Sequence, residues 1–330
     1  MNKITSQQLR TELLNCLNDG NFHSGEALAE QFGLSRSAIS NHIKALGHLG
    51  LEIFSVKGRG YQLATKIDLL SHNSICKGMQ VEQASLVQVE NIVSSTNDIL
   101  KQQSQELSQE QSKNGMVCLA EAQTDGRGRR GRKWVSPYGA SLYFSMLWQF
   151  DNGYQAMSGL SIMVGVVLNN TLAQFGVTSS RLKWPNDVYG NNKKLAGILI
   201  EVEGQADASV SAIIGIGLNL RLPNDLQGID QAFTDLSDLL EKPFSRNELS
   251  KKLIENLWLA LPVFEAQGLN PFIEDWDEAD LYKNQEVVLI SGDKRVKGVA
   301  RGIDNSGALL LETDQKIKPY YGGEISVRPA

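Results

Sequence analysis

The chain has 330 residues, 42% of them hydrophobic and 21% charged, which is the composition of a folded globular protein and excludes a disordered or collagen-like chain. Its net charge of −5 argues against a protein that coats nucleic acid along its whole length. The longest apolar run, residues 158–168, is shorter than the ~20 residues of a membrane-spanning helix. The polar N-terminus lacks the pattern of a signal peptide, so we expect a cytoplasmic protein with no membrane partner.

Cysteine and histidine are too scarce for two common kinds of site. The three cysteines lie far apart, and the sequence has no CxxC motif and no Cys/His cluster. We therefore expect neither a disulfide framework nor a protein-held metal site. All four histidines lie at or before His72, so a Ser-His-Asp or Cys-His site in the rest of the chain would need the N-terminal segment.

Residues 24–47 have the pattern of two helices joined by a tight turn at Gly33. Each helix has one apolar face, because its hydrophobic residues recur at helical spacing. The residues expected to be buried are Ala27, Leu28 and Phe32 in the first helix and Ile39, Ile43 and Leu46 in the second. Two helices in this order form a helix-turn-helix, which places the second helix in a DNA major groove.

The segment around the second helix carries groups that can contact DNA. Residues 52–56 and 61–63 predict a hairpin with a basic tip, which can act as a wing on the DNA backbone. Residues 1–66 hold seven basic and five acidic side chains, a net charge of +2, so the remainder carries −7. The alternative is a small helical domain with a solvated polar face. The candidate DNA-binding residues are Ser35, Arg36, Ser37, Ser40, Asn41, Lys44, Lys57 and Arg59.

Residues 126–134, which we call the Gly/Arg loop, read Gly-Arg-Gly-Arg-Arg-Gly-Arg-Lys-Trp. Glycines allow unusual backbone angles and guanidinium groups donate paired hydrogen bonds, so the segment suits a loop that closes over an anion. The glycines match G-x-G-x-x-G, but Pro137 and Gly139 follow where a dinucleotide-binding fold needs a helix. A solvated basic loop and a nonspecific RNA patch stay open as alternatives.

Three polar side chains lie around a turn at Pro185; they are Lys183, Asn186 and Asp187. A hairpin turn at 190–192 follows, and Lys194 stands at the start of an apolar strand at 195–200. A second apolar strand at 213–219 contains glycines that allow a backbone or a ligand to approach closely. Ser95 or Thr96 is placed to cap a helix.

These cations fit a reaction between a carboxylate and the α-phosphate of a nucleoside triphosphate. Two anions ~4 Å apart repel by ~4 kcal/mol at an effective dielectric constant of ~20. Cations between them offset this repulsion and stabilise the charge that develops in the transition state. The Walker A pattern is absent, which disfavours a P-loop kinase or ATPase. We therefore expect activation of a carboxylate as its adenylate.

These motifs, in this order, resemble the biotin–protein ligase family. Together with the N-terminal head, essentially the whole chain resembles its bacterial members that also repress the biotin operon; the matching segments are 95–97, 126–134, 183–187 and 194–199. The resemblance implies that biotin and ATP, with Mg²⁺, give biotinyl-5′-AMP, and that biotin then passes to a lysine of the biotin carboxyl carrier protein of acetyl-CoA carboxylase. It further implies that the adenylate acts as corepressor by promoting homodimerisation and binding to a symmetric operator DNA.

The resemblance also implies a role for each site residue. On the biotin side, the residues that would hold the ureido ring are Ser95, Thr96, Asn97 and Gln123. The residues that would close over the biotin and the α-phosphate are Arg127, Gly128 and Arg129. Lys194 would meet the biotin carboxylate and then the adenylate phosphate. The residues on the nucleotide side would be Lys183, Asn186 and Asp187, with Trp134 and Asn219 flanking the adenylate. Asp187 would also help to deprotonate the incoming lysine, and the implied catalytic set is Lys194, Lys183, Arg129 and Asp187.

One departure from the family concerns residues 220–236. Repressor members often place a tryptophan there, over the adenine, whereas this segment has none and Phe233 is its nearest aromatic residue. Phenylalanine can also stack on a base.

The expected fold is α+β with three domains. A winged helix-turn-helix would occupy residues 1–66, a central mixed α/β catalytic domain of the biotin/lipoate ligase type 67–273, and a C-terminal SH3-like β-barrel 274–330. Short alternating strands support the last of these; they fall at 286–290, 296–301, 308–312 and 324–328. Two other functions stay open, a ligand-sensing repressor without ligase activity and a ligase whose head does not bind DNA. Lipoate in place of biotin is a further possibility, because lipoate ligases are related.

Overall fold

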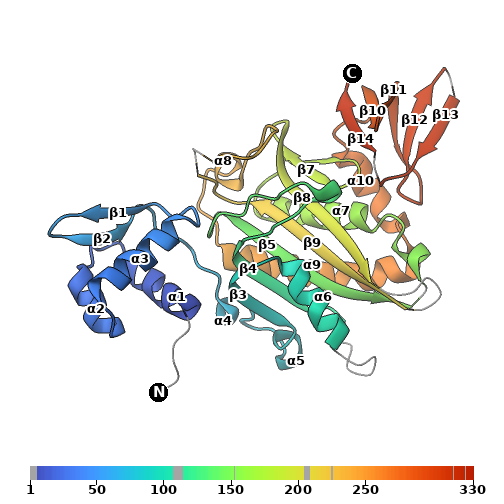
Figure 1. Ribbon diagram of the computed structural model, residues 1–330. Coiled ribbons are helices and arrows are strands. Elements are labelled where there is room, and N and C mark those ends of the chain that lie inside the picture. Colours follow the sequence, from blue (N-terminus) through green and yellow to red (C-terminus); the bar gives the residue numbers. More distant parts are fainter. Residues whose placement is uncertain are drawn as a thin grey trace.

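The computed structural model describes seven stretches of the chain, namely residues 6–106, 114–151, 153–203, 209–223, 226–314, 316–323 and 325–330 (Figure 1). They form three sheets, one of two strands in the N-terminal head, one of seven strands in the centre and one of five strands at the C-terminal end. The head and the C-terminal sheet lie at opposite ends of the central sheet (Figure 1).

The N-terminal head contains the predicted helix-turn-helix and wing (Figure 1). Its elements are α1 (Ser6–Leu17), α2 (Gly25–Phe32), α3 (Arg36–Gly47), β1 (Ile53–Val56) and β2 (Gly60–Leu63). The Ser35 hydroxyl accepts a hydrogen bond from the Ala38 amide and so caps α3, as expected. Gly33 ends α2 with a φ of 64°, a left-handed conformation that favours glycine. The local structure of the head is therefore the one that the sequence pattern predicts.

One detail of the head core differs from the prediction. Ile39, Ile43 and Leu46 are buried, and so is Leu28, but Ala27 is exposed and Ala29 is buried in its place. At about 100° per residue, Ala29 lies about 60° from Phe32 around the helix and so shares the core face, whereas Ala27 lies about 140° from Phe32 and turns toward solvent. Phe32 is half-buried against the same core.

The central sheet has the strand order β3-β4-β5-β9-β8-β7-β6, with β3 and β4 parallel and all other neighbours antiparallel. The strands are β3 (Val87–Val93), β4 (Val117–Gln123), β5 (Ser141–Phe150), β6 (Arg181–Lys183), β7 (Asp187–Gly190), β8 (Lys193–Glu203) and β9 (Val210–Asn219). The expected strands at 195–200 and 213–219 are thus confirmed as parts of β8 and β9.

Helices cover both faces of this sheet. The helices of the body are α4 (His72–Ile75), α5 (Val81–Ala84), α6 (Thr96–Glu106), α7 (Leu160–Gln174), α8 (Leu236–Leu239), α9 (Arg246–Gln267) and α10 (Ile273–Ala279), with single 3-10 turns at η2 (Arg129–Gly131), η3 (Tyr154–Met157) and η4 (Asn270–Phe272). Side chains alternate along β5, so that Phe144 and Met146 join the core with α7 and α9, while Leu147 packs with Leu100 of α6. The face that carries α6 also carries the cavity over the middle of the sheet.

The segment Tyr154–Gln174 is long and apolar enough to pass a length-and-composition test for a membrane-spanning helix. Most of α7 within it is buried against the sheet and α9. A helix that is apolar on all sides is expected in such a core, so the burial explains its composition.

The C-terminal sheet is antiparallel, in the order β13-β12-β11-β10-β14. Its strands are β10 (Glu286–Ser291), β11 (Lys294–Ile303), β12 (Leu309–Thr313), β13 (Lys316–Tyr320) and β14 (Ser326–Pro329). β13 and β14 lie at opposite edges, and the described residues contain no closed barrel, so the SH3-like barrel is not confirmed. The sequence pattern does not predict β13, because its exposed lysines and Pro319 hide the alternation of an edge strand.

The linker between head and body is held by buried polar groups. The Asn18 side chain accepts a hydrogen bond from the Ile67 amide and donates one to the Ile67 carbonyl, both at 2.8 Å. Glu121 of β4 accepts a hydrogen bond from the Leu70 amide and forms a 2.8 Å ion pair with Arg246 of α9. The side chains of this pair are each only 5% exposed, so the linker packs over a charged pair that water does not reach freely.

Candidate functional site

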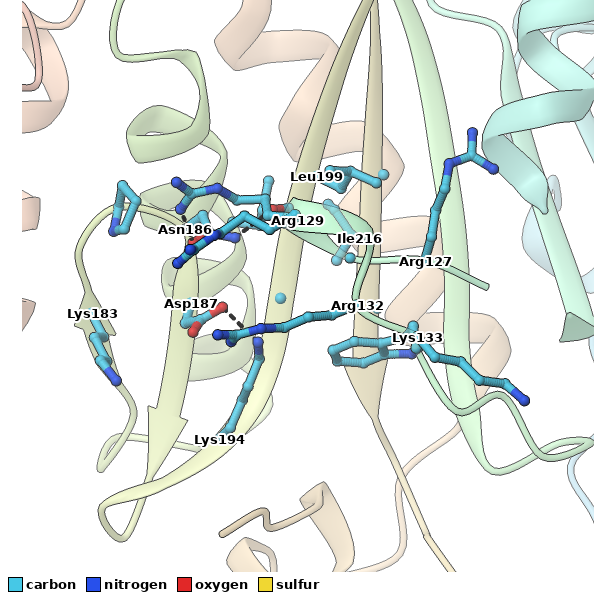
Figure 2. A pocket seen from close by; sticks show the side chains of 18 of the residues that line it. Arg127, Arg129, Arg132, Lys133, Lys183, Asn186, Asp187, Lys194, Leu199 and Ile216 are labelled. Atoms are coloured by element: carbon cyan, nitrogen blue, oxygen red, sulfur yellow. Dashed lines mark hydrogen bonds and ion pairs between the residues drawn. The ribbon is translucent and has the colours of Figure 1, made fainter. Parts of the chain in front are cut away.

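A cavity lies over the middle of the central sheet, between the start of α6, the Gly/Arg loop and β14 (Figure 2). Twelve of the thirteen predicted catalytic and ligand-binding residues line it; they are Ser95, Thr96, Asn97, Gln123, Arg127, Gly128, Arg129, Trp134, Lys183, Asn186, Asp187 and Lys194. Residues from four separate segments of the sequence are thus brought together.

Two glycines of β9 make room for this cavity. A Cβ atom on Gly215 would lie 2.6 Å from the Asn97 Oδ1 atom, and one on Gly217 would overlap the Trp134 indole. Such contacts are too close, so only glycine fits at these two positions. Ile214 and Ile216, which alternate with the glycines, belong to the core with α7 and α9. The sequence pattern at 213–219 therefore reflects a strand with one packed face and one open face.

The Gly/Arg loop folds back on itself. The Trp134 amide donates to the Gly126 carbonyl at 2.8 Å, and the Gly128 amide donates to the Arg132 carbonyl at 2.7 Å. At the tip, Arg130 has a φ of 61°, a left-handed conformation that is uncommon for arginine. A single 3-10 turn and extended chain follow the glycines rather than a helix, so the dinucleotide-binding alternative is excluded.

Arg129 connects this loop to two other parts of the cavity. Its Nη1 atom donates to the Asn186 Oδ1 atom at 2.7 Å, and its Nη2 atom donates to the Gly323 carbonyl. Figure 2 shows the Arg129 and Asn186 side chains meeting on the side of the cavity that carries Lys183. The loop is thereby held across the cavity by one guanidinium group.

Lys194, Asp187 and Trp134 form a second group within the cavity, and Figure 2 shows the Lys194 and Asp187 side chains meeting. The Lys194 Nζ atom pairs with the Asp187 Oδ1 atom at 2.8 Å and lies 5.5 Å from the centre of the Trp134 ring. The Trp134 indole N–H is buried and has no hydrogen-bond partner among the described residues. Because buried donors are rarely left unpaired, this group suits an acceptor on a ligand.

Lys183 lies at the end of β6 and is only 5% exposed. Its Nζ atom donates to the Tyr189 hydroxyl at 2.9 Å. Burial, together with the nearby Arg328 guanidinium, lowers the pKa of the Lys183 ammonium from 10.5 to about 8. An amine with this pKa carries a charge that is poorly compensated by the protein, so an anion beside it would be strongly favoured.

Neutral hydrogen-bonding groups line the opposite end of the cavity. Ser95, Thr96 and Asn97 are all buried at the start of α6. The Gln123 Oε1 atom accepts from the Thr96 amide at 2.9 Å, which leaves the Gln123 amide nitrogen near the Ser136 hydroxyl at 3.3 Å. This end can therefore bind a polar, uncharged ring system.

One implied site residue, Asn219, lies outside the cavity lining, and two further residues have partners that the resemblance does not imply. The Asn219 side chain does not line the cavity among the described residues; it donates to the Thr234 carbonyl at 3.0 Å and supports the segment beside Lys194. Phe233 pairs its backbone with Lys194 and does not line the cavity, whereas Gln231 does. The Arg127 side chain is engaged by two carboxylates, those of Asp98 and Glu201.

Sequence reasoning missed some of the lining residues. Arg328 of β14 reaches the cavity from the C-terminal sheet. No local pattern marks it, because its neighbours read as an ordinary strand and its position depends on how two sheets pack. Three further cations of the Gly/Arg loop also line the cavity; they are Arg130, Arg132 and Lys133. The run of positive charges in this loop is the sequence feature that could have identified them.

A metal ion has no cluster of protein ligands in the described part of the chain. No group of three or more His, Cys, Asp or Glu side chains there could hold one. The carboxylate in the cavity, Asp187, is paired with Lys194. Mg²⁺ therefore fits this site only when phosphate oxygens supply most of its ligands.

In the head, the predicted DNA-binding residues lie on one helix and one hairpin. All of them are exposed except Ser40, which is half-buried; the exposed set is Ser35, Arg36, Ser37, Asn41, Lys44, Lys57 and Arg59. The Arg59 guanidinium lies 4.2 Å from the centre of the Phe22 ring, so the tip of the hairpin is held against the segment between α1 and α2. This surface combines a polar recognition helix with a basic wing.

Comparisons with known proteins agree with this division. The biotin/lipoate A/B protein ligase family matches residues 89–219, a helix-turn-helix domain matches 9–62, and the C-terminal domain of biotin protein ligases matches 283–328. The bifunctional ligase/repressor BirA of Salmonella typhimurium is 43% identical over 321 residues, which cover 96% of this chain and 97% of that protein. Its Escherichia coli counterpart is also 43% identical, with 97% of each chain covered.

A solved structure gives the same result. The biotin protein ligase from Aquifex aeolicus in complex with biotin and ATP is 30% identical, covers 74% of this chain and 99% of its own, and superposes with a TM-score of 0.63. Fold, cavity and head together define a ligase that carries a DNA-binding domain. The chain belongs to the family of bifunctional biotin ligase/repressors, so the resemblance seen in the sequence is confirmed.

Proposed function

We propose that the chain joins biotin to ATP, retains biotinyl-5′-AMP, and transfers the biotinyl group to a lysine of the biotin carboxyl carrier protein of acetyl-CoA carboxylase. The observation that carries this proposal is the convergence of Arg129, Lys183 and Lys194 on one end of a cavity whose other end is lined by Thr96 and Gln123. Neutral donors and acceptors suit the ureido ring, and cations suit a carboxylate beside a phosphate.

The chemistry follows from this arrangement. A biotin carboxylate oxygen attacks the α-phosphorus of ATP, the bond from that phosphorus to the bridging oxygen breaks, and pyrophosphate leaves. Lys194 and Arg129 offset the repulsion between the two anions. The carrier lysine then attacks the acyl carbon of the mixed anhydride, AMP leaves, and the amine loses a proton. Asp187 is in place to assist this last step, because it lies beside Lys194.

The remaining roles follow the positions in the cavity. On the biotin side, the ring is held by Ser95, Thr96, Asn97 and Gln123, and the loop residues Arg127, Gly128 and Arg129 cover it. Lys183, Asn186 and Trp134 face the nucleotide, and Asn219 acts by supporting the neighbouring backbone. Mg²⁺ enters with the ATP phosphates.

We further propose that the chain represses transcription of the biotin biosynthesis operon, with biotinyl-5′-AMP as corepressor. The adenylate-bound form is a homodimer that places two heads on a two-fold symmetric operator. The proposed domains are 1–66 for DNA binding, 67–273 for catalysis and 274–330 for an SH3-like unit. The proposed location is the cytoplasm, where ATP, carrier protein and operator DNA are all present.

The central test is a direct assay for the acyl-adenylate. The protein is incubated with ATP and Mg²⁺ and with either biotin or lipoate, and the products are identified by mass spectrometry. We expect biotinyl-5′-AMP and pyrophosphate, and no lipoyl adenylate. A ligand-sensing repressor without ligase activity would bind biotin and form no adenylate; the presence of both Lys183 and Lys194 argues against it, since sensing alone requires neither.

A further inference from the structure

Arg127 is the first arginine of the Gly/Arg loop, and its side chain points away from the other cations of the cavity (Figure 2). Its Nε atom donates to the Glu201 Oε1 atom at 3.0 Å, and its Nη2 atom donates to Glu201 Oε2 at 2.8 Å. Nη2 also donates to the Asp98 Oδ1 atom at 2.7 Å. Arg127 is therefore held by a paired contact to β8 and a single contact to α6.

These contacts are specific in geometry. A guanidinium that meets one carboxylate through two nitrogen atoms is fixed in direction as well as in distance. The two carboxylates raise the pKa of the Arg127 guanidinium, so it stays charged. All three side chains keep partial contact with solvent, between 28% and 38% exposed, so the contribution is that of a partly screened network rather than a buried one.

Glu201 also connects the loop to the neutral end of the cavity. The Asn97 side-chain amide donates to the same Glu201 Oε2 atom at 2.6 Å. The Asn97 Oδ1 atom in turn accepts from the Ser145 hydroxyl at 2.5 Å, and that hydroxyl lies 2.7 Å from Thr96 Oγ1. One carboxylate thus orients both a ring-binding side chain and the entry of the loop.

We propose that Glu201, assisted by Asp98, is a positioning residue for the ligase reaction: it anchors Arg127 and so fixes the first half of the Gly/Arg loop over the ring-binding end of the cavity. The second half of the loop is held separately, through Arg129. The loop therefore has two independent anchors, one for the biotin end and one for the nucleotide end. The catalytic part of this inference rests on the proposed function; the anchoring part does not.

The anchor is tested first without ligand, by limited digestion with trypsin, which cuts after the arginines of the loop. Glu201→Gln removes the charge that holds Arg127 with almost no change in volume, and we expect cleavage between residues 127 and 133 to become about fivefold faster. Asp98→Asn is a second, more exposed variant that should act in the same direction but less. Glu203→Gln is the matched control, because Glu203 lies on the same strand and pairs with Lys101 instead.

The catalytic role is tested by separating KM from kcat. We expect Glu201→Gln to raise the KM for biotin about fivefold, while kcat for adenylate formation at saturating biotin changes less than about twofold, because Glu201 orients the ring-binding end and not the reacting atoms. A variant that lowers kcat at unchanged KM would overturn the proposal. So would cleavage of both Glu201→Gln and Asp98→Asn at the rate of the control. If the unaltered protein makes no biotinyl adenylate, the proposed function fails, and the digestion still decides whether the anchor exists.

Discussion

At the scale of single residues, two lysines of the cavity, Lys194 and Lys183, have different kinds of partner. The Lys194 Nζ atom has a carboxylate partner at 2.8 Å, whereas the Lys183 Nζ atom, among the described residues, donates to the Tyr189 hydroxyl and lies over the Tyr189 and Tyr282 rings without an ion pair. The difference matters for Lys183, because burial without a carboxylate partner makes its ammonium group lose a proton more easily. Lys194 and Lys183 are therefore tested in different ways, Lys194 by removal of the side chain and Lys183 by pH.

We expect Lys194→Ala to slow adenylate formation by about a thousandfold, because it removes a cation placed where negative charge develops in the transition state. Single-turnover formation of the adenylate measures this directly. Lys193→Ala is the control, since Lys193 is the exposed neighbour on the same strand. A wild-type rate for Lys194→Ala, with the fold intact, would reduce that lysine to a packing role.

The pKa of about 8 for Lys183 predicts a pH dependence. In the free protein, kcat/KM for ATP should fall as the pH rises through about 8, because the neutral amine no longer attracts phosphate. The unfolded chain binds this proton up to a pH near 10.5, so the free energy of unfolding should rise with pH between about 8 and 10.5. Lys183→Arg keeps its charge and should abolish the fall in kcat/KM. An unchanged profile in that variant would assign the titration to another group.

At the scale of elements, the Gly/Arg loop is a short segment with fixed ends. One backbone hydrogen bond between Trp134 and Gly126 closes its base, and the Arg129 side chain holds the other end of the loop to Asn186 and Gly323. A glycine-rich segment loses much conformational entropy when it is ordered, so a few strong contacts decide whether it stays closed.

Arg129→Gly should open this loop and release the adenylate at least about tenfold faster, because the variant lacks two charge-assisted hydrogen bonds. The rate is measured by dilution of a preformed complex and detection of free adenylate. Arg129→Lys retains the charge but not the planar group that reaches two separate acceptors, so its release rate should fall between those of Arg129→Gly and the unaltered protein. Equal retention times for all three proteins would contradict a closing role for Arg129.

Some elements of the fold could be predicted from local sequence patterns, and others could not. The helix-turn-helix, the wing, β8 and β9 could be predicted, because each rests on a local period or motif in a short stretch of the sequence. The cationic loop and the polar turn at 183–187 also stood out, but the grouping of the cavity residues came from the family resemblance. The Arg127–Glu201 contact could not, since 74 positions separate the two residues and the contact depends on how the loop after β4 lies over the sheet toward β8. α9 gave no clear signal, because its apolar face is interrupted by charged residues and by Pro262.

At the scale of the whole molecule, the head is a basic module on an acidic body. The wing and α3 lie at the far end of the molecule from the C-terminal sheet (Figure 1), so DNA can reach the head without covering that sheet. Binding should depend on salt through the few phosphate contacts of the head, and on the adenylate through dimerisation.

Lys57→Ala tests the wing. The measurement is fluorescence anisotropy on a biotin-operator fragment, with biotin and ATP present. The salt slope of log affinity should fall by about one for each phosphate that the protein no longer neutralises, hence by about two in a dimer. Lys66→Ala is a control outside the hairpin. Binding that is insensitive to both salt and adenylate would remove the repressor half of the function and leave a ligase with an inactive head.

The linker network has a practical consequence for shortened forms of the protein. Asp68 accepts hydrogen bonds from the Arg246 amide and the Asn247 side chain, and Leu70 donates to Glu121. A catalytic fragment that begins at Ile67 keeps all of these groups. A fragment that begins at His72 lacks Asp68 and Leu70, so the Arg246–Glu121 pair loses these hydrogen bonds and becomes exposed to water. Residues 67–71 therefore stabilise the catalytic body rather than the head. A fragment without the head should unfold less readily when it begins at Ile67 than when it begins at His72.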